Sequence, residues 1–197
     1  VNVNWFEDYA ADLLVGGRSY AYVPGQFTTD LPVGDVYVEI CKGFEYTPVR
    51  RKVRIRPGQK ELVLRVNRWK DLRTNGWVTA DTHVHFLSTQ GAHTEAAGEG
   101  VNVVNLLLSQ WGHLFTNTEE FVGRPNVSPD GDTIVYATQE NRQHILGHLT
   151  LLGLKEPVNP WCSDGPGEAE LGGNMETTLS RWADECHAQG GTVVIPH

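Results

Sequence analysis

Two histidines separated by one residue, His83 and His85, have the type and spacing that a metal site requires. They follow the apolar run 77–80 in a stretch typical of a β-strand, where side chains two residues apart lie on the same face. Both imidazoles can therefore point at one transition-metal ion. Asp81 shares that face, and we expect it to bind the metal or to orient an imidazole. The alternative is a surface strand with two incidental histidines.

Further ligand-type residues recur at the ends of later apolar runs. Glu140 follows the run 133–137, His148 comes eight residues later, and His197 follows the run 192–195. A carboxylate with several imidazoles is the composition of a dinuclear hydrolase site, in which one carboxylate bridges two ions about 3.5–4 Å apart and water is activated as the nucleophile. In the alternative interpretation, Glu140 is a loop acid and His148 faces a helix.

Polar residues near Glu140 indicate where a substrate could bind. Asn141, Arg142 and His144 follow Glu140 closely, and Gln110 follows the strand-like run 101–108. Arg142 has the charge to pair with an anionic group. We expect these four residues to line a substrate pocket, although an ordinary polar surface would carry the same residue types.

Residues 1–72 predict an all-β sandwich domain. Strand-like runs at 19–23, 36–40, 51–55 and 61–66 are separated by turns rich in proline and glycine. Short strands at this spacing favour an antiparallel sandwich. This region contains no histidine. We expect it to serve packing, with surface binding of a carbohydrate-like ligand as the alternative.

Residues 73–197 predict an α/β domain. A strand ending at residue 85 is followed by a helix at 94–100, strands at 101–108 and 133–137, a helix at 175–189 and a strand at 192–195. This alternation favours a parallel sheet, open or closed into a barrel. In such folds the chemistry collects at the carboxyl ends of the strands, where the histidines and Glu140 lie.

The motifs resemble, in their order, those of the PHP superfamily (polymerase and histidinol phosphatase). They are Asp81-x-His83-x-His85, Glu140 with the later Gly147-His148-Leu149, and the segment 190–197. The Gly76-Trp77 lead-in and the segments 100–106 and 140–144 are more similar to the CehA/McbA branch of metallohydrolases. The resemblance covers residues 76 to 197. Residues 1–72 are only loosely similar to the carboxypeptidase-regulatory-like sandwiches often fused to such enzymes.

The resemblance implies a distorted β/α barrel that binds divalent ions and hydrolyses phosphoesters or, in this branch, carboxyl or carbamate esters. It implies Glu140 and His148 as catalytic residues, with Glu140 as the bridge. It implies as metal ligands His83, His85, Glu140, His148 and His197. Relatives carry an aspartate where this chain has residues 88–90 and an Asp-His pair where it has residues 108–110. We therefore expect two ions, zinc, manganese or iron, instead of three.

Composition limits the partners. The formal charge of −8 disfavours nucleic acid, and the longest apolar runs are too short for a membrane span. We expect a small-molecule ester as substrate, which an acidic protein can accept through its metal ions even when the ester is anionic. The rival interpretation is a non-catalytic sandwich that binds a glycan or an envelope component and carries a degenerate metallohydrolase remnant. We also expect cut ends, with the family's last ligands beyond residue 197 and the hydrolase domain incomplete.

Overall fold

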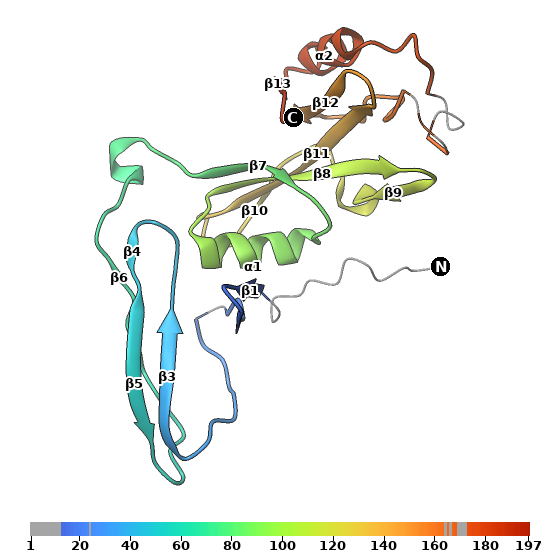
Figure 1. The fold of residues 1–197 in the computed structure, drawn as a ribbon. Helices are drawn as coiled ribbons and strands as arrows, with labels where there is room; N and C mark the ends of the chain where they lie inside the picture. The colour runs from blue at the N-terminus through green and yellow to red at the C-terminus, as the bar shows by residue number, and fades with distance from the viewer. Residues whose placement is uncertain (1–12, 24, 164, 166, 169–172) are drawn as a thin grey trace.

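The computed structural model describes residues 13–23, 25–163, 165, 167–168 and 173–197. Within these ranges the chain is a mixed α/β arrangement that consists mostly of strands and has two α-helices (Figure 1). Residues 1–12, the start of the predicted sandwich, lie outside the described ranges. The second part of the chain forms one large sheet, and this sheet carries the predicted ligands.

The described part of the N-terminal region contains three antiparallel pairs of strands. The pairs are β1 (Leu13–Val15) with β2 (Arg18–Tyr20), β3 (Gly34–Ile40) with β5 (Val49–Ile55), and β4 (Tyr46–Thr47) with β6 (Asn67–Arg68). On the charged face of the β3–β5 pair, Lys52 lies 2.8 Å from Asp35 and Arg50 lies 2.6 Å from Glu39. Ion pairs near the surface add only about 0–1 kcal/mol, so the alternating valines and isoleucines of the opposite face are the stronger reason for this pairing.

The four strands predicted in this region have different outcomes. The runs 36–40 and 51–55 lie within β3 and β5, whereas only the start of 19–23 is a strand. Residues 61–66 form no strand among the described residues, so that prediction is wrong. Alternation shows which side chains are buried, but a strand also needs a neighbouring backbone to pair with. Two packed sheets are not seen in the described ranges, and the sandwich stays a prediction.

The second part of the chain forms a seven-stranded sheet. Its strands are β7 (Ala80–Val84), β8 (Val103–Trp111), β9 (Leu114–Thr116), β10 (Asn126–Val127), β11 (Ile134–Gln143), β12 (Gly147–Leu152) and β13 (Thr192–Val194). The main path is β13-β12-β11-β8-β7, with β9 on β8 and β10 on β11. The strands β7, β8 and β11 are parallel, as predicted, whereas β12 is antiparallel to both β11 and β13. Short 3-10 turns occur at η1 (Arg73–Asn75) and η2 (Thr118–Glu120).

The connection between β11 and β12 is a tight hairpin. Gln143 Oε1 accepts the backbone N–H of Ile145 at 2.7 Å and also that of Leu146. Gly147 has a φ of +99°, which glycine adopts at little cost. A parallel crossover needs a dozen or more residues, so this short connection forces β12 to run back along β11. The prediction of a wholly parallel sheet is therefore wrong beyond β11, and Glu140 and His148 lie on neighbouring antiparallel strands.

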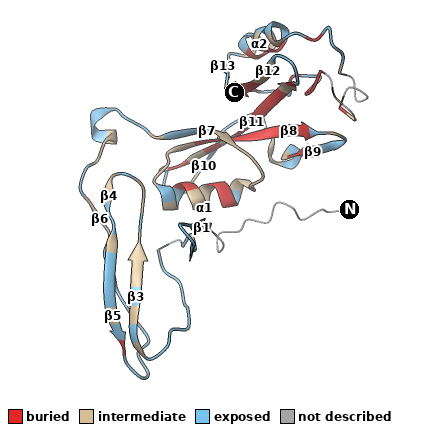
Figure 2. Ribbon diagram, in the orientation of Figure 1, coloured by how far each residue is buried: buried red, intermediate tan, exposed pale blue. Residues whose placement is uncertain are grey.

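Both α-helices pack on the same face of the sheet. Helix α1 (Thr89–Glu99) packs through Ala92 and Ala96 against Val104, Leu106 and Val135. Helix α2 (Leu179–Ala188) packs through Trp182 and Cys186 against Leu149 and Leu151. The register of β8, β11 and β12 places these apolar strand residues on one face. Figure 2 shows that β8 and β11 are buried along most of their length. The opposite face is left free for polar side chains.

The helices start where side chains cap them. Ser88 Oγ accepts the backbone N–H of Gly91 at 3.0 Å, so α1 begins at Thr89 and not at the predicted residue 94. Thr178 Oγ1 accepts the N–H of Arg181 at 3.2 Å, so α2 begins four residues later than predicted, at Leu179. Both predicted helices are present, and only their boundaries differ.

The sheet is strongly curled. In the order β12-β11-β8-β7, two strands separate β12 from β7, which in a flat sheet puts them about 14 Å apart. Thr150 Oγ1 of β12 nevertheless lies 3.3 Å from Nδ1 of His83 on β7. The sheet therefore closes over its helix-free face as a half-barrel, and the side chains of distant strands meet on the concave side.

Candidate metal centre

A buried carboxylate on β11 is the middle of the centre. Glu140 is only 2% exposed and pairs in register with Thr150, on the concave face. Its Oε2 accepts a hydrogen bond from Ser109 Oγ at 3.2 Å and lies 3.0 Å from His85 Nε2. Its Oε1 lies 2.8 Å from His148 Nδ1. Each oxygen thus has polar partners, which offset the cost of burying a charge.

Strand β7 brings two imidazoles to this carboxylate. The Nε2 atoms of His83 and His85 lie 3.1 Å apart, and His83 Nε2 lies 3.7 Å from Glu140 Oε1. The chain turns sharply after His85, because Phe86 has a φ of +67° and its N–H donates to Asn117 Oδ1 at 3.2 Å. A left-handed conformation costs a non-glycine residue about 1–3 kcal/mol, so the Asn117 hydrogen bond helps to hold this turn.

His197, after β13, completes the cluster. Its Nε2 lies 3.8 Å from Glu140 Oε1, and its ring centroid lies 4.6 Å from that of His148 and 5.5 Å from that of His83. The structure thus brings all five predicted ligands together. The side chain of His197 is 59% exposed and that of His83 28%, against 14% for His85 and 19% for His148. The cluster is therefore open to solvent on the side of His197.

The protonation states suit a divalent ion. Burial lowers the pKa of His83 and the pKa of His148 from the usual 6.5, despite the nearby carboxylate. Burial alone would raise the pKa of Glu140, but the hydrogen bond from His85 and the surrounding imidazoles lower it to about 2. At neutral pH the centre holds an ionised carboxylate with neutral rings at His83 and His148. These are the forms that bind a metal ion.

The spacing of the donor atoms also fits a metal ion. Two atoms that each bind one ion at about 2.0–2.2 Å lie roughly 3–3.5 Å from each other. The His83–His85 distance of 3.1 Å and the His85–Glu140 distance of 3.0 Å lie in that range. The donor atoms of His83, Glu140 and His197 all lie within 4.8 Å of one another. This cluster of histidines and glutamate could hold a metal ion.

Among the described residues, three that were predicted near the site make no hydrogen bond to the side chains of the cluster. Asp81 Oδ1 accepts the backbone N–H of His83 at 3.0 Å and does not orient its ring. Asn141 and Gln110 are buried on the helix-facing side of the sheet. The amide of Asn141 donates to the carbonyl of Pro160 at 3.2 Å, and that of Gln110 donates to the carbonyl of Gly112 at 3.0 Å. Both amides hold loops in place.

Arg142 and His144 follow Glu140 toward the β11–β12 hairpin. The guanidinium carbon of Arg142 lies 4.1 Å from the ring centroid of Trp111, whose ring lies 6.1 Å from that of His85. His144 Nε2 lies 2.5 Å from Glu168 Oε2. Arg142 and Trp111 therefore form a wall beside His85, and His144 lies farther out.

Sequence reasoning missed four residues of this region, Ser109, Thr150, Trp111 and Glu168. Ser109 and Thr150 meet the ligands only because of the register and curl of the sheet, which the sequence does not show. Trp111 lies at the end of β8, and its partner Arg142 is on another strand. Glu168 is 5% exposed, although its glycine-rich surroundings carry no signal for burial. Only the order, register and curl of the strands bring these four residues to the site, and the sequence does not show them.

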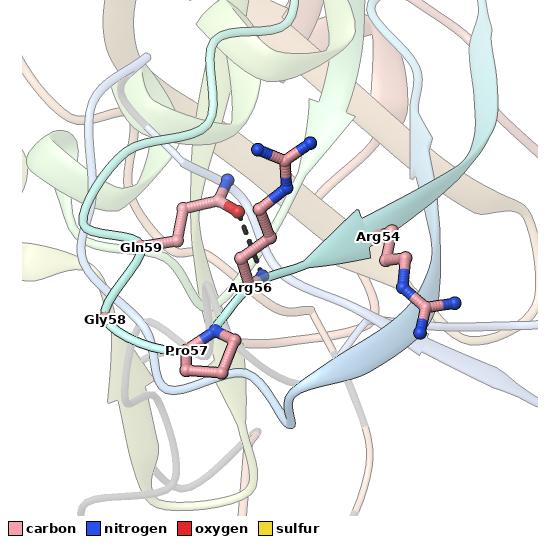
Figure 3. A pocket seen from close by; sticks show the side chains of 5 residues that line it. All are labelled: Arg54, Arg56, Pro57, Gly58 and Gln59. Carbon is pink, nitrogen blue, oxygen red and sulfur yellow. Dashed lines mark hydrogen bonds between the residues drawn. The ribbon is translucent and has the colours of Figure 1, made fainter.

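A separate hollow lies at the turn after β5. Figure 3 shows that Arg54, Arg56, Pro57, Gly58 and Gln59 line it, with the backbone N–H of Arg56 donating to Gln59 Oε1 at 3.1 Å. The hollow is wide open and contains none of the predicted ligands. Its lining has no histidine, carboxylate or nucleophilic side chain. The concave face of the sheet is therefore the candidate site.

Comparisons with known proteins add no relative: no family model, no curated protein and no solved structure matches this chain. Neither helix in the described part of the chain is long and apolar enough to cross a membrane.

Proposed function

We propose that this protein is a metal-dependent hydrolase of the PHP superfamily, of the CehA/McbA-like branch, acting on a small-molecule ester. The proposal rests on one observation, the convergence of four imidazoles from three strand segments, β7, β12 and β13, on the buried carboxylate of Glu140. A purely structural role for such a cluster is disfavoured, because it gathers ionisable groups at a face that is open to solvent.

The orientation of Glu140 supports a bridging role. Its Oε1 faces His83, His148 and His197, whereas its Oε2 faces His85. The two oxygens thus meet different imidazoles, as expected for a carboxylate shared by two ions of zinc, manganese or iron. Divalent ions held there would supply a water of lowered pKa and polarise an ester oxygen. Ser109 is one of the residues 108–110, where PHP-superfamily members carry an Asp-His pair, and its Oγ donates to Oε2. The absence of that pair of ligands favours two ions over three.

The protein's own residues would organise the substrate around this centre. His197 and His83, the more exposed rings, lie at the entrance, and the less exposed His85 and His148 lie deeper. The Thr150 hydroxyl, 3.3 Å from His83 Nδ1, fixes the ring so that its Nε2 faces the carboxylate. A preorganised set of donors needs little rearrangement when charge develops on the reacting ester.

Metal analysis and hydrolysis assays test this proposal. We expect the purified full-length protein to retain zinc, manganese or iron after dialysis and to hydrolyse at least one of 4-nitrophenyl phosphate, 4-nitrophenyl acetate and an aryl carbamate. His83→Ala and Glu140→Gln should lose both properties. His187→Ala is the matched control, because His187 is exposed in the last turn of α2 and should change neither. A protein that retains no metal would contradict the proposal and favour the rival interpretation, a binding module with a degenerate remnant.

A further inference from the structure

Arg142 brings a cationic group to the wall of the metal centre. It lies two residues after Glu140 on the same face of β11, so strand geometry separates the two Cα atoms by about 6.6–6.8 Å. In register it lies opposite His148. Its side chain is 11% exposed and stacks on Trp111, the ring that also neighbours His85. A ligand bound at the cluster would therefore extend directly past Arg142.

The protein uses only part of this guanidinium. Its hydrogen bonds to described residues both come from Nη1, which donates to the Gln110 carbonyl at 2.8 Å and lies 3.5 Å from Glu168 Oε1. Nε is buried and has no partner among the described residues. A guanidinium offers five N–H donors, and a buried donor without an acceptor is unfavourable. The arginine thus has hydrogen-bonding capacity left for a ligand.

A structural role in holding Glu168 does not account for Arg142. Glu168 already accepts the backbone N–H of Gly112 at 3.0 Å and has His144 Nε2 at 2.5 Å. Its contact with Arg142, at 3.5 Å, is the longest of the three. The charge of Arg142 is therefore only loosely paired, and Trp111 holds the side chain toward the concave face through a cation–π contact.

We propose that Arg142, backed by Trp111, recognises a second anionic group of the substrate, a carboxylate or a phosphate separate from the bond that is hydrolysed. The idea rests on the proposed function, because it places the reacting bond at the metal centre. It narrows the substrate class to small esters that carry a separate acid group. Neutral esters would be accepted but would lack this contact.

Binding of an anion to the metal-free protein tests the role of Arg142 without catalysis. The chain has six tryptophans, so a proton–nitrogen correlation spectrum shows few indole signals, and Trp111→Phe assigns the one of interest. We expect glutarate or inorganic phosphate, titrated in the presence of a chelator, to shift the Trp111 signal. The neutral analogue glutaramide should leave it in place. In Arg142→Gln the apparent Kd should rise about tenfold or more, as the loss of a charge-assisted contact implies.

Two further variants separate anion binding from an effect on folding. Glu168→Gln keeps the arginine and removes its loose partner, so anion binding should persist or tighten. Arg142→Lys keeps the charge without the planar fork and should bind with intermediate affinity. A wild-type signal that glutarate and phosphate leave unchanged, or an equal shift in wild type and Arg142→Gln, would overturn the proposal.

Kinetics then distinguish this inference from the proposed function. With metal bound, mono-(4-nitrophenyl) glutarate should have a higher kcat/KM than 4-nitrophenyl pentanoate. Arg142→Gln should lower kcat/KM more for the anionic ester than for the neutral ester, so that this preference disappears. Hydrolysis without a preference for the anionic ester contradicts the role of Arg142 alone. Anion binding in a protein that hydrolyses neither ester contradicts the hydrolase and leaves the anion site standing.

Discussion

Removing the Ser109 hydroxyl should weaken metal binding by about 10- to 100-fold. Ser109 is fully buried, and its Oγ donates to Glu140 Oε2 at 3.2 Å. A hydrogen bond to a charged acceptor contributes about 1.5–3 kcal/mol, and each 1.4 kcal/mol is a factor of ten in affinity. Loss of partners that orient metal ligands has effects of this same size. Ser109→Ala therefore leaves the ligands in place but allows the carboxylate to rotate.

Thr116→Val is the matched control. Thr116 is also buried, and its Oγ1 donates to the carbonyl of Ser109 at 3.2 Å without contacting Glu140. Both variants lose one buried hydroxyl, so urea unfolding should show that each is destabilised. Competition with a chromophoric chelator should show weaker zinc or manganese binding in Ser109→Ala alone. Equal metal affinities in the two variants would refute the role assigned to this hydroxyl.

Three further predictions concern stability. Metal at 100 times its Kd should stabilise the folded state by about 2.7 kcal/mol, which at 2–4 °C per kcal/mol raises Tm by about 5–11 °C. Calorimetry of Glu140→Gln with the same metal should show no comparable rise. Trp182→Ala, which empties the fully buried contact of α2 with β12, should cost about 3–5 kcal/mol in urea unfolding, and a loss below 1 kcal/mol would contradict the core described for this helix. Burial alone would raise the pKa of Glu168, but the Gly112 N–H, His144 and Arg142 lower it from 4.5. The contribution of Glu168 to the free energy of unfolding should therefore be present above pH 4.5 and lost as the pH falls through the lower pKa of the folded state. Glu168→Gln should flatten the acid side of the plot of unfolding free energy against pH. An unchanged acid side would show that the folded state does not stabilise this carboxylate.

The sequence predicts much of the sheet because local patterns decide it. The buried runs of β8 and β11 and the amphipathic spacing of α2 are local properties, and they place these elements within a few residues of their observed positions. Residues 61–66 show the limit, because they alternate like a strand and yet lack a pairing neighbour among the described residues. Alternation indicates burial but cannot identify a partner strand.

The candidate ligands could be found because their residue types are scarce and their spacing is regular. His83 lies in β7 and His85 directly follows this strand, and Glu140, His148 and His197 each lie near a strand end. The residues that support them belong to common types, and serine or threonine on a strand rarely stands out. Ser109 and Thr150 gain their roles only when β8 and β12 are in register with β11 and the sheet curls. Such long-range geometry leaves no mark in a local pattern.

The curl of the sheet has a mechanical consequence for loading with metal. His83 lies on one outer strand of the main path, β7, and His197 follows the other, β13. An ion bound by both would join the two outer strands of the sheet. Because the unfolded chain lacks this assembled site, the binding free energy adds to the free energy of folding. Removal of the ion by a chelator would then loosen the outer strands β7 and β13 while the middle strands β8 and β11 stay ordered. Binding of the ion and closure of the half-barrel would therefore be cooperative.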